Sequence, residues 1–384
     1  MRKSVPDAVI VGAGPAGATA AFLLAANGLR VLILDRSHFP REKLCGGLLT
    51  WKTIQTLASV FSVTAATLTA EKIIRYESRG YLVGGRNSRP IHGTLDYPFH
   101  LVERKVYDQF WLKRAVSAGA EFRPGVRVIS CNPSAGQVVT SDGEILNGRF
   151  LLGADGVASR VRSALRRAGK LADPRLGETA IAIETFAPRT ISGAFPDYPC
   201  LHYGHIPWGY AWSFPASERQ LLGILGLKNK SGRRVAACFR DFLSSQPVRM
   251  ENGLRFRSRS LPYGNYLATP GWNNCLLLGD AAGLADPFLG EGIYYAHRSA
   301  QLASNAILET RSHPESALQA YRSRFLRILY PELRYAHAAR RLIFSLPPRL
   351  YYPFLNLLLR VRPKVWEETI QGQRTFRWLK KLNT

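Results

Sequence analysis

Apolar residues in the first part of the chain follow the order of a strand, a helix and a second strand. Ala8–Val11 is a short, continuous apolar run, which indicates a buried parallel strand. A glycine-rich turn follows, and residues 15–27 predict a helix that ends at Gly28. Val31–Leu34 is a second apolar run with Asp35 at its end. The pattern therefore predicts a βαβ unit built on a parallel sheet.

The turn between the first strand and the helix carries glycines that suit a bound dinucleotide. Gly12 permits the tight turn, Gly14 lets the backbone approach a pyrophosphate, and Gly17 lets the helix pack closely on the sheet. The helix N-terminus offers unpaired N–H groups to the phosphates, and Asp35 can accept hydrogen bonds from an adenosine ribose. Because a strand precedes this pattern and a helix follows it, the pattern predicts a dinucleotide site.

Two later segments also run from an apolar strand into a Gly and Asp motif. Residues 151–162 pass through Gly-Ala-Asp155-Gly into a basic helix. Residues 275–293 pass through Gly-Asp280 to a long helix that we expect to begin near Gly290. Asp280 is placed to accept hydrogen bonds from a ribityl or phosphate group, and the start of the long helix would face an electron-rich ring edge.

Between these motifs the pattern changes to an alternation that is typical of antiparallel strands. The expected strands are residues 181–186, 202–206, 210–214 and 221–227, with a helix over residues 231–245. We expect a mixed α/β (α+β) fold in which a discontinuous Rossmann-like domain takes residues 1–75, 100–175 and 270–330. An inserted antiparallel sheet domain takes residues 76–99 and 176–269, and residues 331–384 form a helical C-terminal region.

Composition and charge narrow the class of protein. The 384 residues are 46% hydrophobic and 21% charged, which supports a large core and argues against extensive disorder. Lys and Arg number 52 against 27 Asp and Glu, a formal charge of +25. This excess attracts nucleic acid, anionic lipid headgroups or phosphorylated substrates, or it serves solubility alone.

The cysteines do not form a metal-binding or disulfide pattern. The chain has five, at widely spaced positions without a Cys-x-x-Cys, namely Cys45, Cys131, Cys200, Cys238 and Cys275. This pattern argues against a disulfide scaffold and a structural zinc site, so we expect no metal and a reducing cytoplasm. Arg2 and Lys3 before an apolar run resemble a signal peptide, but Asp7 and the glycines favour the strand and helix.

The three motifs, in this order and spacing, resemble the para-hydroxybenzoate hydroxylase-type FAD-dependent oxidoreductases over residues 1–330. The resemblance implies an FAD-binding domain of the glutathione reductase type and no second dinucleotide fold for NAD(P)H. It implies that Arg104 lies near the FAD phosphates, although a charge at the start of a surface helix is the alternative. The cofactor-binding residues that it implies are Gly12, Gly14, Ala16, Gly17, Asp35, Arg36, Cys45, Gly46, Arg104, Val128, Asp155, Asp280, Gly290, Gly292 and Ile293.

Two further features resemble the geranylgeranyl reductase family within this superfamily. One is the Cys45-Gly46-Gly pair after the second strand, which the family places beside the flavin. The other is Tyr-x-Trp-x-Phe-Pro, whose residues Tyr210, Trp212, Phe214 and Pro215 are the expected substrate-binding set. Alternation puts the three aromatic rings on one face of a strand, which suits a greasy substrate, although an aromatic core strand is the structural alternative. The family's Gly-x-Gly that should follow is replaced by Gly223 and Gly226.

The resemblance implies reduction of carbon–carbon double bonds in a geranylgeranyl or other prenyl chain of a lipid or isoprenoid. Reduced flavin would supply hydride, and the protein would supply orientation, a dry cavity and a proton. Cys45 is the catalytic candidate, which donates the proton directly or through water, or only contacts FAD. His38, His202 and His205 are other candidate acids. NADPH, ferredoxin and a quinol all stay open as the reductant.

Three other functions remain as alternatives. A class A flavin monooxygenase would share the FAD domain, and a flavin-dependent halogenase would carry Trp-x-Trp-x-Ile-Pro, where this chain has Tyr210 and Phe214. A basic nucleic-acid-binding protein would explain the charge, but the chain has no recognition helix, zinc finger or RNA-binding signature. We therefore expect no nucleic-acid partner, and we expect a monomer.

The C-terminal region combines apolar runs with positive charge. Residues 334–384 carry eleven Lys or Arg and two acids, and prolines interrupt their apolar stretch. No apolar stretch of the chain predicts a transmembrane helix. We expect either an interfacial element on an anionic membrane, at the inner face of the cytoplasmic membrane and with Trp366 and Trp378 at the boundary, or a helical cap on the substrate domain.

Overall fold

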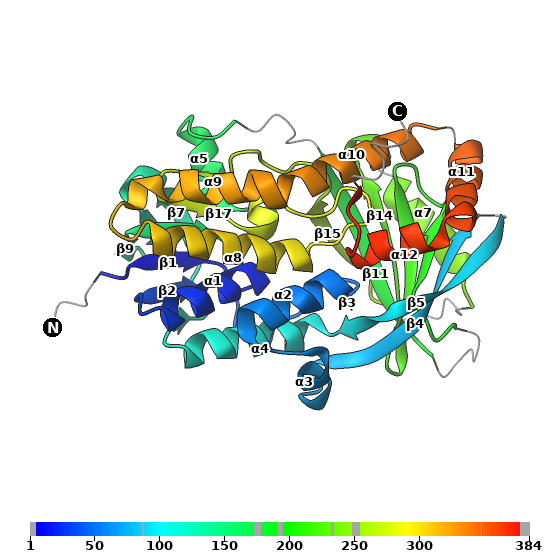
Figure 1. Cartoon of the computed structure of the whole chain (residues 1–384), viewed down its shortest axis with the longest axis horizontal. Helices are drawn as coiled ribbons and strands as arrows, with labels where there is room; N and C mark the ends of the chain where they lie inside the picture. The colour runs from blue at the N-terminus through cyan, green and yellow to red at the C-terminus, as the bar shows by residue number, and fades with distance from the viewer. Residues whose placement is uncertain are drawn as a thin grey trace.

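The computed structural model describes residues 5–86, 88–172, 178–189, 195–231, 234–247, 254–346 and 348–376. Within this part of the chain, the strands form sheets of six, eight and three members. Figure 1 shows the six-stranded sheet and its helices at one end of the molecule and the eight-stranded sheet at the other. The fold class expected from the sequence corresponds to this mixed α/β architecture.

The six-stranded sheet has the order β16-β17-β10-β1-β2-β6, and its central strands are parallel. The bounds of its strands are Gly271–Trp272, Cys275–Leu277, Phe150–Gly153, Ala8–Val11, Val31–Leu34 and Glu121–Arg123. The strands β1 and β2 are confirmed with the bounds that the apolar runs predict. All eight of their residues are buried, as expected for a parallel sheet covered on both faces.

Helices α1 (Pro15–Ala26), α4 (Arg104–Ser117) and α8 (Ile293–Glu309) pack together beside this sheet. The same half holds α2 (Trp51–Phe61), α3 (Ala65–Ala70), α5 (Arg160–Arg167) and α9 (Ala317–Ile328). The three-stranded sheet comprises β7 (Val128–Asn132), β8 (Gln137–Thr140) and β9 (Ile145–Asn147). The helix α8 begins at Ile293 rather than near Gly290, because Gly290 has a φ of 73° and cannot join a right-handed helix there.

The eight-stranded sheet has the order β15-β11-β14-β13-β12-β4-β5-β3. The bounds are Arg257–Pro262, Thr179–Pro188, Arg219–Leu227, Gly209–Ala216, Cys200–Tyr203, Ile74–Gly85, Ser88–Val102 and Leu48–Leu49. The long hairpin β4–β5 therefore joins strands that follow it by a hundred residues, and Leu82 pairs with Cys200. The expected strand over 202–206 is wrong in position, because the chain turns at Gly204, whose φ is 89°.

Helices cover both faces of the eight-stranded sheet. The helix α7 (Val235–Ser244), which starts later than predicted, packs Phe239 and Phe242 on one face, and α6 (Lys228–Ser231) precedes it. The other face meets the C-terminal helices α10 (Tyr330–Phe344), α11 (Pro348–Val361) and α12 (Pro363–Gln371). In Figure 1 the helices α9 and α10 run one after the other along one edge of the molecule toward α11. Among the described residues, no helix combines the length and apolar character that crossing a bilayer requires.

A buried histidine joins the three helices beside the six-stranded sheet. His297 of α8 is fully buried and hydrogen-bonds through Nδ1 with Thr19 Oγ1 of α1 at 2.7 Å. Its Nε2 hydrogen-bonds with Tyr107 Oη of α4, also at 2.7 Å. Burial lowers the pKa of His297 to about 3, so the ring is neutral and each nitrogen has one partner.

We predict that His297→Gln lowers the free energy of unfolding and makes that free energy less dependent on pH in the acid range. The pKa of this group is lower in the folded chain, so its contribution to stability is present above pH 6.5 and is lost as pH falls toward 3. Replacement should cost about 1–3 kcal/mol near neutral pH, because two buried hydrogen bonds change. Below pH 6.5, the free energy of unfolding should fall less steeply in the variant, by up to about 1.4 kcal/mol per pH unit. Chemical denaturation at several pH values measures both effects, and parallel curves for the two proteins would contradict the prediction.

Candidate active site

A cavity of about 1120 Å³ runs from the glycine turn after β1 to the aromatic face of β13. Gly14 and Asp35 line one end, and Trp212 and Trp366 line the other. The cavity therefore connects the six-stranded sheet with the eight-stranded sheet. A space of this size accepts a ligand larger than most drug-sized molecules.

Each of the three glycines in the turn is needed for a different reason. A Cβ on Gly17 would lie 1.8 Å from the Gly12 carbonyl oxygen, so Gly17 permits the close packing of α1 on the sheet. Gly12 has a φ of 103°, and a Cβ there would lie 2.4 Å from the Ala154 carbonyl oxygen. Gly14 instead faces the cavity, where a Cβ would meet only the Arg41 guanidinium at 3.4 Å. The turn is thus built to bring backbone N–H groups against a ligand.

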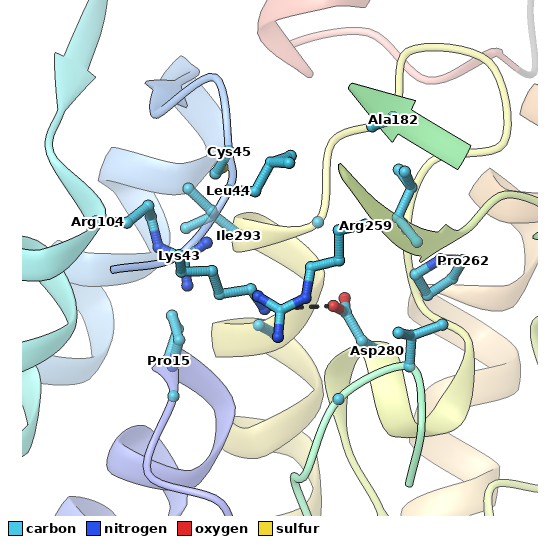
Figure 2. Close-up of a pocket in the computed structure, with 18 of the residues that line it drawn as sticks. Pro15, Lys43, Leu44, Cys45, Arg104, Ala182, Arg259, Pro262, Asp280 and Ile293 are labelled. Atoms are coloured by element: carbon cyan, nitrogen blue, oxygen red, sulfur yellow. Dashed lines mark ion pairs between the residues drawn. The ribbon is translucent and has the colours of Figure 1, made fainter. Parts of the chain in front are cut away.

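Three helices begin at the wall of this cavity. Figure 2 shows Pro15, Arg104 and Ile293, the first residues of α1, α4 and α8, around the same space. The residues before them provide no side-chain hydrogen bond to cap these helices. Their N–H groups and the positive ends of their dipoles are therefore available to an anionic or electron-rich ligand.

Three carboxylates expected from the sequence also line the cavity. Asp35 accepts hydrogen bonds from the backbone N–H groups of Ala13 at 2.8 Å and Ser37 at 2.9 Å. Asp155 accepts one from Arg160 N at 2.6 Å, and its second buried oxygen has no partner among the described residues. Burial raises the pKa of Asp155. An oxygen left without a partner in this position is what a ligand hydroxyl or N–H group would satisfy.

Asp280 faces Lys43 across the cavity. Their Oδ2 and Nζ atoms are 3.6 Å apart, and Figure 2 shows this ion pair with Arg259 beside it. Burial lowers the pKa of Lys43, and burial with nearby Arg41 lowers that of Arg259. Spacing alone gave no sign of Lys43 or Arg259, because both come from segments that only the fold brings to the motif.

Arg104 is buried, with 7% of its surface exposed, so the surface-charge alternative is wrong. Its guanidinium donates two hydrogen bonds to Asp108, at 2.8 and 2.9 Å. Arg41 lies 3.3 Å from the same carboxylate and also reaches Gly14. Both arginines line the cavity. The sequence interpretation named Arg104 but missed Arg41, which is a second candidate contact for phosphates.

The Cys45 loop packs against the aromatic strand. The Gly47 N–H donates to Cys45 Sγ at 3.4 Å, and Cys45 also interacts with Arg104. A Cβ on Gly46 would lie 2.8 Å from the Phe214 ring, and one on Gly47 would lie 2.1 Å from the Val102 carbonyl oxygen. Glycines after Cys45 are therefore required by the close approach of Phe214 and the strand β5. This contact explains why the two sequence features that resemble one family occur together.

The aromatic residues of β13 share one face, as alternation predicts. The ring centroids of Tyr210 and Trp212 are 6.2 Å apart, and those of Trp212 and Phe214 are 6.4 Å apart. Tyr210 Oη donates to the Leu289 carbonyl oxygen, next to the start of α8. Gly223 pairs with Trp212 across the strands, and a Cβ there would lie 2.1 Å from the indole. Gly223 thus leaves room for the Trp212 ring.

The far end of the cavity is closed by α12. Trp366 and Ile370 line the cavity, and the Gln371 side chain accepts a hydrogen bond from Trp51 N at 2.7 Å. Trp366 is only 7% exposed, so its predicted place at a membrane boundary is wrong. Its apolar ring closes this end of the cavity instead. Trp378 lies outside the described residues.

Most residues expected at the site do line the cavity. They are Gly12, Gly14, Ala16, Asp35, Arg36, Cys45, Gly46, Arg104, Val128, Asp155, Asp280, Gly290, Gly292, Ile293, Tyr210, Trp212 and Phe214. Gly17 and Pro215 do not: Gly17 packs on Gly12, and Pro215 lines a smaller cavity. None of His38, His202 and His205 lines the main cavity. His202 and His205 pack against Phe242 of α7 on the opposite face of the sheet.

Glu291 is a further cavity residue that spacing did not indicate. Its carboxylate accepts a hydrogen bond from Thr50 Oγ1 at 2.6 Å and lies 2.7 Å from Lys52 Nζ. Lys52 also lies over the Tyr294 ring. These contacts hold the turn before α8 against α2, so the start of α8 is fixed at the cavity.

Comparisons with known proteins agree with this geometry. Residues 6–191 match the FAD binding domain family. A geranylgeranyl diphosphate reductase of Rhodobacter capsulatus is 29% identical, over 79% of this chain and 75% of that protein. A digeranylgeranylglycerophospholipid reductase of Methanosarcina acetivorans is 28% identical, over 83% of this chain and 78% of that protein.

Solved structures share the fold. A geranylgeranyl bacteriochlorophyll reductase-like protein from Thermoplasma acidophilum has a TM-score of 0.79 and 21% identity, covering 91% of this chain and 90% of its own. A flavin-dependent halogenase has a TM-score of 0.70 and 20% identity, covering 90% of this chain and 66% of its own. At these identities the two structures establish the architecture and do not distinguish between the two chemistries.

We predict that Gly14→Ala and Gly17→Ala fail in different ways. Gly14 has a φ of −70°, which alanine adopts readily, so the apoprotein should keep its stability while the added methyl group weakens FAD retention. In Gly17→Ala the methyl group meets the Gly12 carbonyl, which should cost about 1–3 kcal/mol of stability. Thermal unfolding of the apoproteins and flavin absorbance after gel filtration separate the two effects. Equal destabilisation by both variants would refute this division of roles.

Proposed function

We propose that this chain, an FAD-dependent oxidoreductase related to the geranylgeranyl reductases, saturates carbon–carbon double bonds of a prenyl chain in a lipid or isoprenoid. The observation that carries the proposal is one continuous cavity. It joins the glycine turn and three helix N-termini to a chamber lined by Tyr210, Trp212 and Phe214, with Cys45 between the two parts. The names of the two relatives above support the same class of substrate.

The end of the cavity formed by the glycine turn, Asp35 and Arg41, which we call the cradle, fits FAD. Gly14 admits a pyrophosphate, Arg41 lies over that glycine, and Asp35 stands at the end of β2 where a ribose would lie. The positive ends of α1 and α8 would stabilise the phosphates and the ring edge. Reduced FAD, when bound, would supply hydride to one carbon of the double bond.

The substrate chamber would hold the prenyl chain and exclude water. Its aromatic rings offer flat apolar faces with little rotamer entropy to lose, and Trp366 and Ile370 close its end. An isolated alkene also needs a proton at its second carbon. The Cys45 thiol faces this chamber and stands beside the cradle, and none of the three candidate histidines does. We therefore assign Cys45 as the proton donor.

We expect Cys45→Ser to bind FAD but to reduce prenyl lipids at least about a hundredfold more slowly, because a serine hydroxyl is a much weaker acid than a thiol. The test is anaerobic: the flavin is reduced, a geranylgeranyl lipid is added, and mass spectrometry follows the gain of two hydrogens. Cys238→Ser, on α7 away from the cavity, is the matched control.

Two results would count against the proposal. Unchanged turnover in Cys45→Ser would remove the thiol from the reaction. An oxygenated or halogenated product under air, with no gain of hydrogen in its absence, would indicate a monooxygenase or a halogenase instead.

The helix α11 supports a second proposal, that the protein associates peripherally with an anionic membrane. Leu350, Leu357 and Val361 are 56%, 59% and 66% exposed and recur at helical spacing on one face. The opposite face packs Tyr352, Leu355 and Leu359 into the core. A helix that is apolar on both faces needs a second apolar neighbour. Residues 333–366 contain seven Lys or Arg and no Asp or Glu, which suits anionic headgroups.

We predict that Leu350→Asp/Leu357→Asp abolishes co-sedimentation with vesicles of anionic phospholipid and leaves the reduction of a detergent-dispersed substrate intact. Ile145→Asp, 57% exposed on β9, is the control and should sediment like the wild type. Binding of the wild type to RNA but not to anionic vesicles would overturn the membrane proposal.

A further inference from the structure

A second, smaller cavity of about 110 Å³ lies behind the Cys45 loop. Cys45 lines both cavities, together with Lys43, Gly46 and Arg104. The thiol therefore stands at the boundary between the main cavity and a polar space on the other side of its loop. Any proton that Cys45 gives to a substrate can be replaced from this side without opening the substrate chamber.

Glu184 faces this smaller cavity from the strand β11. Alternation along β11 puts Ala182 against the main cavity and Glu184, two residues later on the same face, against the smaller one. Glu184 is 2% exposed, and its Oε2 atom has no hydrogen-bond partner among the described residues. The Cys45 backbone N–H lies near enough to the Glu184 carboxylate to act against the rise of its pKa. An unsatisfied acid that touches the Cys45 loop is costly to bury and calls for an explanation.

The charges around Glu184 come from several elements. The titratable or charged groups that line the smaller cavity are Glu42, Lys43 and Cys45 of the loop, Arg75 and Tyr76 of β4, Glu103, Arg104 and Lys105 at the start of α4, Arg219 of β14 and Arg257 of β15. Arg257 pairs with Glu184 across the strands and lies 3.1 Å from Glu42, whose surface is largely exposed. Arg257 and Glu42 are both partly exposed, so the smaller cavity has an exposed ion pair among its lining residues.

Burial raises the pKa of Glu184 to about 7, although Arg257 and the Cys45 N–H act in the opposite direction. Both forms of the carboxyl are then populated near neutral pH. A group with this property can release a proton and regain it at similar cost.

We propose that Glu184 acts through Cys45, as a positioning and proton-relay residue that restores the thiol after each reduction. This inference rests on the proposed prenyl reduction. Reduced FAD, when bound, would supply hydride to one alkene carbon, and the Cys45 S–H proton would bond to the other, which leaves a thiolate. The Glu184 O–H proton then returns to sulfur, and the carboxylate takes a proton from solvent through the smaller cavity. The sum is one hydride and one proton added across the double bond.

The first test measures the thiol itself in the FAD-loaded protein. Iodoacetamide alkylation of the Cys45 peptide is followed by mass spectrometry from pH 6 to 9 in wild type and Glu184→Gln. Once ionised, the Glu184 carboxylate opposes the thiolate, so the variant should be alkylated at least about threefold faster above pH 7 and equally fast below it. Glu367→Gln, at another buried glutamate, on α12, should match the wild type.

Folding of the variant is checked by its stability. The pKa of Glu184 is raised in the folded chain, so the wild type loses stability as pH rises from 4.5 to about 7, and Glu184→Gln should not. The variant should therefore be at least as stable as the wild type above pH 7. A variant that is less stable there would show that Glu184 holds the loop by structure alone and would overturn the relay.

The second test follows repeated turnover of prenyl lipid under anaerobic conditions, with a reductant that keeps the flavin reduced, because the relay acts only after the thiol has given up its first proton. Wild-type turnover should fall as pH rises through about 7, whereas Glu184→Gln should be slower by about tenfold to a hundredfold and lack this transition. Identical alkylation profiles for the two proteins would overturn the relay while leaving prenyl reduction intact. If the two proteins differ in alkylation as expected but the wild type reduces no prenyl lipid, the proposed function would be overturned instead.

Discussion

The close approach of α1 to β1 is the constraint on which the half of the molecule with the six-stranded sheet depends. It exists because Gly17 has no Cβ to collide with the Gly12 carbonyl oxygen. This contact sets where α1 begins, and His297 then joins α1 to α4 and α8. Three helix starts are thereby held around one cavity, so the favourable electrostatics of the cradle follow from a packing contact that touches no ligand.

The half of the molecule that contains the eight-stranded sheet depends on a row of positions across that sheet. Glu184, Gly223 and Trp212 are neighbours on β11, β14 and β13. The missing side chain at Gly223 gives the Trp212 indole its place, and the Cys45 loop approaches the same face because Gly46 accepts the Phe214 ring. Gly223 thus lies between the aromatic ring of Trp212 and the buried carboxyl of Glu184, which are two strands apart.

Sequence reasoning succeeded where the chemistry is local. The spacing of Gly12, Gly14 and Gly17 between a strand and a helix defines the cradle, and alternation places Tyr210 and Trp212 on one face. Glu184, Arg41 and Glu291 could not be found in this way, because strand register or loop packing brings them to the cavity. Trp366 was misplaced for a related reason: an apolar and basic segment has the same local pattern whether its tryptophan meets lipid or a protein core.

The pairing of β4 with β12 has a consequence for how the chain is made. Leu82 must wait for Cys200, and the sheet is complete only when β15 has been synthesised. The parallel sheet of the other half likewise lacks β17 until residue 277 has left the ribosome. Neither half can therefore finish folding during the synthesis of the first two thirds of the chain. The long β4–β5 hairpin must stay unpaired on one edge until β12 has been synthesised, a state in which chaperone binding would compete with aggregation.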